Sequence, residues 1–181
     1  IQLGNPKITP CRGIVITSDL KVTGGTLTGN STFSGDAGSA YPMTLPINRD
    51  LIITGGTFNL TNRPTGLSPG GAIQLNVGRN ISQTGGSLFS TSSFGSQNNI
   101  NMSGSAAQTL EITNNFTDVG LSITNTSATL GVTLANNVTI QPSAAFILNR
   151  GYVKLGNYSL TVPGSRFFQN SFTPMPRIVT S

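Results

Sequence analysis

Apolar and polar residues alternate along most of the chain. In residues 50–54, Leu51 and Ile53 fall on one parity. The run stops at a pair of glycines, and inward-facing apolar positions resume after the turn, at Phe58. Successive side chains of a β-strand point to opposite faces, so this alternation predicts half-buried strands. We find no long stretch with the 3.6-residue period of a helix. The pattern therefore predicts an all-β protein.

The triplet Thr-Gly-Gly gives this pattern a longer period. It begins at Thr23, Thr54 and Thr84, which is a spacing of about 30 residues. Repetition at a fixed spacing is typical of a repeat architecture, in which each copy is one structural unit. Aligned on the triplet, the copies place apolar residues in shared columns before and after the glycines: Leu20, Leu51 and Ile81, then Leu27, Phe58 and Leu88.

The two glycines are expected to form a corner between two short strands. Glycine adopts positive φ at little steric cost, and Asn is the next most tolerant residue. A fourth, weaker copy carries Asn114-Asn115 at the corner, after Leu110 and Ile112. This replacement agrees with a backbone requirement at the corner, and a binding role would not predict it.

Short strands and corners that recur about every 30 residues predict a right-handed parallel β-helix, or solenoid, with protruding loops. Successive coils would stack about 4.8 Å apart, and the inward columns would form a continuous apolar core. An antiparallel β-sandwich, which also has many short strands, is the alternative fold. The fixed register of the triplet favours the solenoid.

Residues 1–162 are expected to form a single solenoid domain, because the alternation continues in the second half without the triplet. Residues 163–181 are expected to be an irregular C-terminal tail or a cap, since an uncovered coil end exposes an unpaired strand edge. Residues 34–48 and 61–71 lack alternation and contain prolines. We expect them to be loops that protrude from the coils, where function is usually located on a repeat scaffold.

Composition narrows the possible functions. Charged residues make up 8% of the chain, the net charge is +5, and the ten Lys and Arg are scattered. No cluster of bases interleaves with aromatic residues, so we do not expect a nucleic-acid surface. No apolar stretch is long enough to insert into a membrane. The chain has no His and a single cysteine, Cys11, which excludes His-based triads and Cys/His zinc sites.

Asp19, Asp50 and Asn80 share one repeat column and are the candidate metal ligands. If the coils stack in register, their side chains lie about 5 Å apart. They would then suit a Ca²⁺ ion, or a carboxylate pair in a polysaccharide-degrading enzyme of pectin-lyase-like fold. Calcium usually takes six to eight oxygen ligands, so we prefer a structural role with Arg49 partly neutralising the acids. We expect no cofactor other than this candidate Ca²⁺.

Tyr152, Lys154 and Tyr158 are the candidate ligand-binding residues. Tyr152 and Lys154 share parity, so they should share a face opposite Val153 and Leu155. A carbohydrate-binding module would use such exposed aromatic rings beside polar groups. Packing at a sheet edge is the alternative role for these tyrosines.

Several phrases of the sequence resemble repeat segments of very large secreted surface proteins of Bacteroidetes-type bacteria: "NRDLIITGGTFNLT", "VGRNISQTGGSLFS", "LSITNTSATLGVTLANNVTI" and "GYVKLGNYSLTV". Those proteins are often adhesin-like, and many resemble cargo of the type IX secretion system. The resemblance covers residues 15–162, roughly, and supplies no catalytic positions. It implies a β-solenoid scaffold with an extracellular location.

We therefore expect a non-catalytic structural or adhesive solenoid segment of a larger cell-surface or secreted protein. The alternatives are a carbohydrate-binding module and a polysaccharide-degrading enzyme. The expected partners are other segments of the same large protein, neighbouring chains or a surface polysaccharide.

Overall fold

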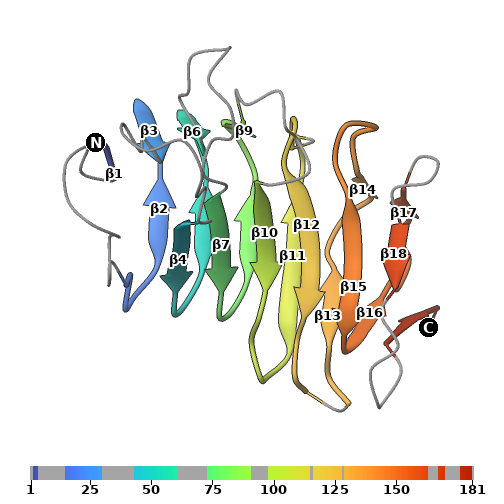
Figure 1. The fold of residues 1–181 in the computed structure, drawn as a ribbon. Helices are drawn as coiled ribbons and strands as arrows, with labels where there is room; N and C mark the ends of the chain where they lie inside the picture. Colours follow the sequence, from blue (N-terminus) through green and yellow to red (C-terminus); the bar gives the residue numbers. More distant parts are fainter. Residues whose placement is uncertain are drawn as a thin grey trace, which may run out of the picture.

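The structure is a computed structural model of the chain. It describes residues 2–3, 15–29, 43–60, 73–90, 98–114, 116–127, 129–162, 167–169 and 176–180. In these residues the backbone forms strands, bends and turns, and no helix. Within each sheet the strands follow chain order, from the N-terminal end to the C-terminal end of the molecule (Figure 1). The prediction of an all-β protein is confirmed.

The strands form four sheets. The seven-stranded sheet has the order β2 (Leu20–Val22), β5 (Leu51–Ile53), β8 (Ile81–Gln83), β11 (Gln108–Ile112), β13 (Val132–Leu134), β16 (Tyr152–Lys154) and β19 (Arg177–Val179). The six-stranded sheet has the order β4 (Met43–Ile47), β7 (Ile73–Val77), β10 (Asn99–Met102), β12 (Gly120–Thr124), β15 (Phe146–Arg150) and β18 (Phe167–Gln169). The four-stranded sheet contains β1 (Gln2–Leu3), β3 (Thr26–Gly29), β6 (Thr57–Asn59) and β9 (Ser87–Phe89). The two-stranded sheet pairs β14 (Val138–Thr139) with β17 (Leu160–Thr161).

Every ladder between these strands is parallel. In the seven-stranded sheet, Leu20 lies opposite Leu51, Leu51 opposite Ile81, and Ile81 opposite Leu110. This is the column that the Thr-Gly-Gly alignment predicted. Parallel pairing excludes the antiparallel sandwich for the described strands, and the architecture is compatible with a β-solenoid.

The sequence separation between paired residues changes along the molecule. The first three steps each span about 30 residues, for the pairs Leu20–Leu51, Leu51–Ile81 and Ile81–Leu110. The next three steps are all shorter, for the pairs Leu110–Leu134, Val132–Val153 and Val153–Ile178. A separation of about 30 residues is therefore found only in the first three steps. The segments 30–42, 61–72 and 91–97, which fall within these steps, lie outside the described residues.

Alternating side chains of the larger sheets form one apolar core. Leu51, Leu75 and Leu121 are fully buried, and each has apolar neighbours in the same column of the adjacent strands. Near the C-terminal end, the ring of Phe146 stacks on that of Phe167, with 5.7 Å between centroids. The pattern of alternation therefore identified the inward positions correctly.

The Thr-Gly-Gly corner depends on its second glycine in every copy and on its first glycine in the second and third copies. The second glycine has positive φ in each copy, with 67° at Gly25, 71° at Gly56 and 64° at Gly86. In the second and third copies the first glycine is needed because each corner lies in close contact with the preceding corner. A Cβ at Gly55 would lie 2.6 Å from the carbonyl oxygen of Thr23. In the fourth copy Asn114 forms part of a bend and donates from Nδ2 to Gly86 O at 2.9 Å, while Asn115 lies outside the described residues.

The expected loop at 34–48 is wrong for its C-terminal part. Met43–Ile47 is strand β4 and pairs in register with β7, so that Leu45 lies opposite Leu75. Pro46 suggested a loop, because proline has no N–H to donate to a neighbouring strand. The missing N–H is tolerated here because β4 is the outermost strand of its sheet. On its outer side β4 forms an isolated bridge between Ile16 and Ile47. The rest of that segment and the expected loop at 61–71 lie outside the described residues.

Part of the expected irregular tail at 163–181 is regular. β18 pairs with β15 in the six-stranded sheet, and β19 pairs with β16 in the seven-stranded sheet. Both strands continue the parallel stacking, since Phe167 lies opposite Phe146 and Ile178 lies opposite Val153. The domain boundary at 162 and the capping role stay predictions.

Candidate functional site

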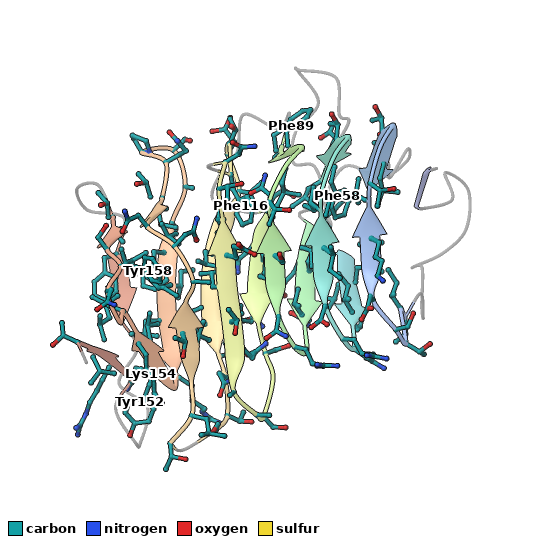
Figure 2. All side chains as sticks on the ribbon, turned by 180° about the vertical axis from the view of Figure 1, so that it is seen from behind. Phe58, Phe89, Phe116, Tyr152, Lys154 and Tyr158 are labelled. Atoms are coloured by element: carbon teal, nitrogen blue, oxygen red, sulfur yellow. The ribbon has the colours of Figure 1, made fainter. Side chains whose placement is uncertain are left out.

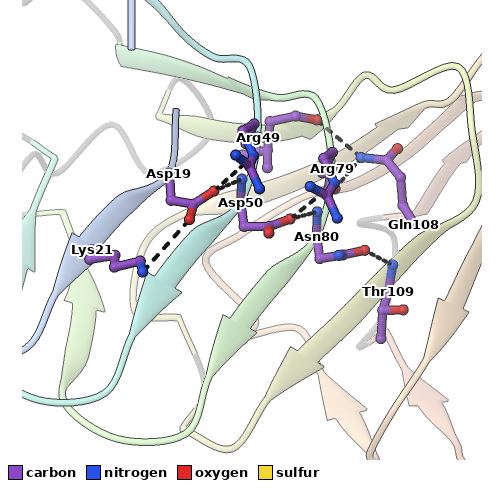
Figure 3. Close-up of polar contacts among 9 residues, drawn as sticks. Asp19, Lys21, Arg49, Asp50, Arg79, Asn80, Gln108 and Thr109 are labelled. Atoms are coloured by element: carbon purple, nitrogen blue, oxygen red, sulfur yellow. Dashed lines mark hydrogen bonds and ion pairs between the residues drawn. The ribbon is translucent and has the colours of Figure 1, made fainter. Parts of the chain in front are cut away.

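Asp19, Asp50 and Asn80 stand directly before β2, β5 and β8, in one line across the seven-stranded sheet (Figure 3). The side-chain oxygen of each residue accepts a backbone N–H from the following strand segment. Asp19 Oδ1 accepts from Asp50 at 3.3 Å, Asp50 Oδ1 from Asn80 at 2.8 Å, and Asn80 Oδ1 from Thr109 at 2.8 Å. We call these three residues the side-chain ladder. It extends the hydrogen bonding of the sheet by one position at the start of each strand.

Basic side chains accompany the two acids of the ladder. Arg49 Nε lies 3.4 Å from Asp19 Oδ1, Lys21 Nζ lies 3.7 Å from Asp19 Oδ2, and Arg79 Nε lies 3.8 Å from Asp50 Oδ1. The acid side chains are 21% and 18% exposed, whereas the bases are more than half exposed. Exposed pairs of this kind typically contribute about 0–1 kcal/mol, so the hydrogen bonds to backbone are the more important contacts.

The ladder does not fit a calcium shell. Calcium needs six to eight converging oxygens, but the Oδ1 atoms of all three residues already face backbone N–H groups. Two of these atoms also lie next to arginine. Within the described parts of the chain, no three His, Cys, Asp or Glu residues are grouped closely enough to hold a metal ion. The geometry favours the structural interpretation of the ladder over the metal site.

A buried polar cluster that the sequence did not reveal surrounds Gln108, the first residue of β11, and links it to the chain at the ends of β7, β10 and β12. Gln108 is 1% exposed and Asn125 is fully buried. Gln108 Nε2 donates to Val77 O at 3.1 Å and also to Arg79 O. Gln108 Oε1 accepts from Gly104 N at 3.1 Å and from Asn125 Nδ2 at 2.8 Å. The only sign of this cluster in the sequence is that Gln108 falls at an inward-facing position of the alternation. In the structure it lies opposite the buried Val132.

The structure brings Tyr152 and Lys154 together and leaves Tyr158 apart. Tyr152 and Lys154 point outward from β16, on either side of Val153, which is 1% exposed. The predicted shared face of these two residues is confirmed. Tyr158 follows a turn at Gly156 and is 42% exposed (Figure 2). It lies well away from the other two side chains in the view of Figure 2.

A residue of the C-terminal segment is a neighbour of Tyr152 that the sequence did not predict. Arg177 on β19 lies directly opposite Tyr152 on β16, and Val179 lies opposite Lys154. All three residues of β19 are exposed. Sequence spacing offered no sign of this neighbour, because the paired positions are far apart in the chain.

Comparisons with known proteins supply no further identification. No protein-family model matches the chain, and neither the curated proteins nor the solved structures give a match. Among the residues that the structure describes, no helix has the length and apolar character needed to cross a membrane.

Proposed function

We propose that this chain is a non-catalytic structural and adhesive segment of a larger secreted or cell-surface protein. The observation that carries the proposal is the continuous parallel stacking from β2 to β19, with one apolar core beneath it. A fold that grows by adding equivalent strands forms a stiff, extended body, which suits a spacer or a stalk. The resemblance of the repeat phrases to large surface proteins supports the extracellular location and export as type IX cargo.

The finer architecture of this proposal is a right-handed parallel β-helix. Parallel strands in one sheet are joined by right-handed crossovers in nearly all known cases. The coils would be about 30 residues long in the N-terminal half, in line with the Leu20–Leu51–Ile81 column, and shorter in the C-terminal half. The partners would be further coils of the same large protein or neighbouring chains.

The use of the acids supports a scaffold rather than an enzyme. Asp19 and Asp50 are the pair that a polysaccharide-degrading enzyme would need, but both accept backbone N–H groups and face arginines. A general acid or a nucleophile has to reach the substrate, and an oxygen held in a backbone hydrogen bond is poorly placed for that task. No observation favours the pectin-lyase-like alternative.

Limited proteolysis together with a panel of polysaccharide-hydrolysis assays tests the proposal. We expect the described strands from β2 to β16 to resist protease treatment, and the chain to release no sugar product. Release of product by the purified chain that is lost in both Asp19→Asn and Asp50→Asn would overturn the non-catalytic assignment. Cleavage within the described strands at low protease concentration would overturn the rigid scaffold.

A further inference from the structure

Charge is distributed unevenly along the sequence. Residues 1–118 contain six Lys and Arg and five Asp and Glu, which leaves a net charge of +1. Residues 119–181 contain four basic residues and no acid, which accounts for the remaining +4. The bases of this second part are Arg150, Lys154, Arg166 and Arg177. The C-terminal third of the chain therefore carries positive charge that no acid of its own sequence balances.

The fold gathers part of this charge on one outward surface. Lys154 on β16 and Arg177 on β19 belong to neighbouring strands at the end of the seven-stranded sheet. Tyr152 lies opposite Arg177 and two residues before Lys154 on the same strand. Arg177 is exposed and Lys154 is half-buried. Figure 2 shows Tyr152 and Lys154 adjacent to each other at one end of the sheet. We call Tyr152, Lys154 and Arg177 the basic face.

Hydroxyl groups extend the basic face across the sheet. Thr109 pairs with Thr133, and Thr133 pairs with Lys154, so the three residues form one outward row over β11, β13 and β16. Both threonines are exposed. Neighbouring rungs of a sheet lie about 4.8 Å apart, so the row presents two hydroxyls and one ammonium group at regular spacing.

We propose that the basic face, with the row of Thr109 and Thr133, binds an anionic polysaccharide. A guanidinium group pairs with carboxylate or sulfate through two parallel hydrogen bonds, and an ammonium group acts as a second point charge. The threonines offer donors and acceptors to sugar hydroxyls, and the ring of Tyr152 offers an apolar surface to a sugar ring. The ligand class is a polymer of acidic sugars. This inference rests on the adhesive part of the proposed function and specifies its ligand.

A polysaccharide fits this surface better than a nucleic acid does. Proteins that hold single-stranded nucleic acid stack successive bases on several aromatic rings. Over β11, β13, β16 and β19, Tyr152 supplies the only aromatic ring among the described strand residues. Threonines take the positions where further rings would be needed. The surface therefore has the composition for a charged, hydroxyl-rich polymer.

Binding to defined polymers by the full chain tests this inference. Polygalacturonate presents carboxylates, heparin presents sulfates, dextran is a neutral control, and single-stranded oligothymidylate represents nucleic acid. We compare the wild type with Lys154→Gln/Arg177→Gln and with the matched control Arg49→Gln/Arg79→Gln, which loses the same charge elsewhere. Circular dichroism confirms that each variant keeps its strands.

The expected result is binding of the wild type to one or both acidic polysaccharides, and none to dextran. The comparison of polygalacturonate with heparin decides whether carboxylate or sulfate is the preferred anion. We expect the Lys154/Arg177 variant to bind about tenfold more weakly and the control variant to change less than about twofold. Equal weakening in both variants would overturn the site, because overall charge would explain the binding. Tighter binding to oligothymidylate than to either polysaccharide would replace the ligand class by nucleic acid.

Absence of wild-type binding to both acidic polysaccharides would overturn the inference by itself. The structural role is measured separately by protease resistance and would be unaffected by that result. Conversely, a protease-sensitive chain that still binds polysaccharide would contradict the scaffold and leave the basic face in place.

Discussion

Asp50 Oδ1 accepts the backbone N–H of Asn80, one repeat later in the chain, at 2.8 Å. The contact makes a side chain serve as one more rung of a parallel ladder, just before the strands β5 and β8 begin. Asp50, which the sequence offered as a catalytic or metal-binding candidate, therefore helps to hold successive strands together. This relationship leads to the first of four predictions about stability.

Asp50→Ala should destabilise the protein by about 1–3 kcal/mol, because the N–H of Asn80 loses a partly buried, charged acceptor. Asp50→Asn keeps an oxygen acceptor and should cost less. Asp19→Ala should also cost less, since its contact to Asp50 N is longer, at 3.3 Å. Urea unfolding followed by circular dichroism gives the three values. Equal losses in Asp50→Ala and Asp19→Ala would show that the hydrogen bond lengths do not govern the ladder.

Gly55→Ala should destabilise the protein by about 2 kcal/mol or more, because the new Cβ would lie 2.6 Å from Thr23 O in the neighbouring corner. Gly24→Ala is the matched control. Gly24 is also the first glycine of its triplet and has no positive φ, but its added Cβ has no atom within 4 Å. It should be neutral or slightly stabilising, since alanine lowers the entropy of the unfolded chain. A Gly24→Ala variant as unstable as Gly55→Ala would contradict the role of corner stacking.

Leu75→Ala should cost about 2–5 kcal/mol, because Leu75 is fully buried between Leu45 and Ile100 in the six-stranded sheet. The same substitution at Leu130, which is 46% exposed, should change the stability by less than about 0.5 kcal/mol. Thermal unfolding of the two variants makes the comparison. Similar melting temperatures would mean that the strand β7 does not lie within a packed core.

Gln108→Leu should destabilise the protein by about 3 kcal/mol or more, despite adding an apolar side chain at an inward position. The variant leaves Val77 O, Gly104 N and Asn125 Nδ2 without the amide that they contact in the folded chain. Thr109→Val, an exposed change on the same strand, should be nearly neutral. A stabilised Gln108→Leu variant would show that the polar cluster is not needed to hold the start of β11 against the ends of β7 and β12.

Local sequence patterns predicted the stacked column and its corner well. Leu20, Leu51 and Ile81 lie opposite one another, and the second glycines have positive φ. Both features follow from steric rules that act within a few residues. The strand at Met43–Ile47 was missed because Pro46 weakens the local signal for a strand, while its pairing with the distant strand β7 is a long-range effect.

In the candidate sites, too, some features follow from local sequence and others depend on pairing between distant strands. The sequence placed Tyr152 and Lys154 on one face, because alternation alone determines which side chains of a strand point together. It could not place Arg177 beside Tyr152, since that neighbour depends on how β19 joins the sheet. Nor could it show that the oxygens of Asp19 and Asp50 face backbone N–H groups, which depends on the register between strands.

By itself, the sequence determined that the protein is built from strands, which side chains face the core, and where the chain turns. Those properties follow from the two-residue alternation and from the conformational freedom of glycine. Only the tertiary structure decided which strands are neighbours, how the separation shortens after Leu110, and which polar groups meet across rungs. The reason is that a parallel ladder joins residues that are distant in the chain, and the choice among such partners is made by packing of the whole core.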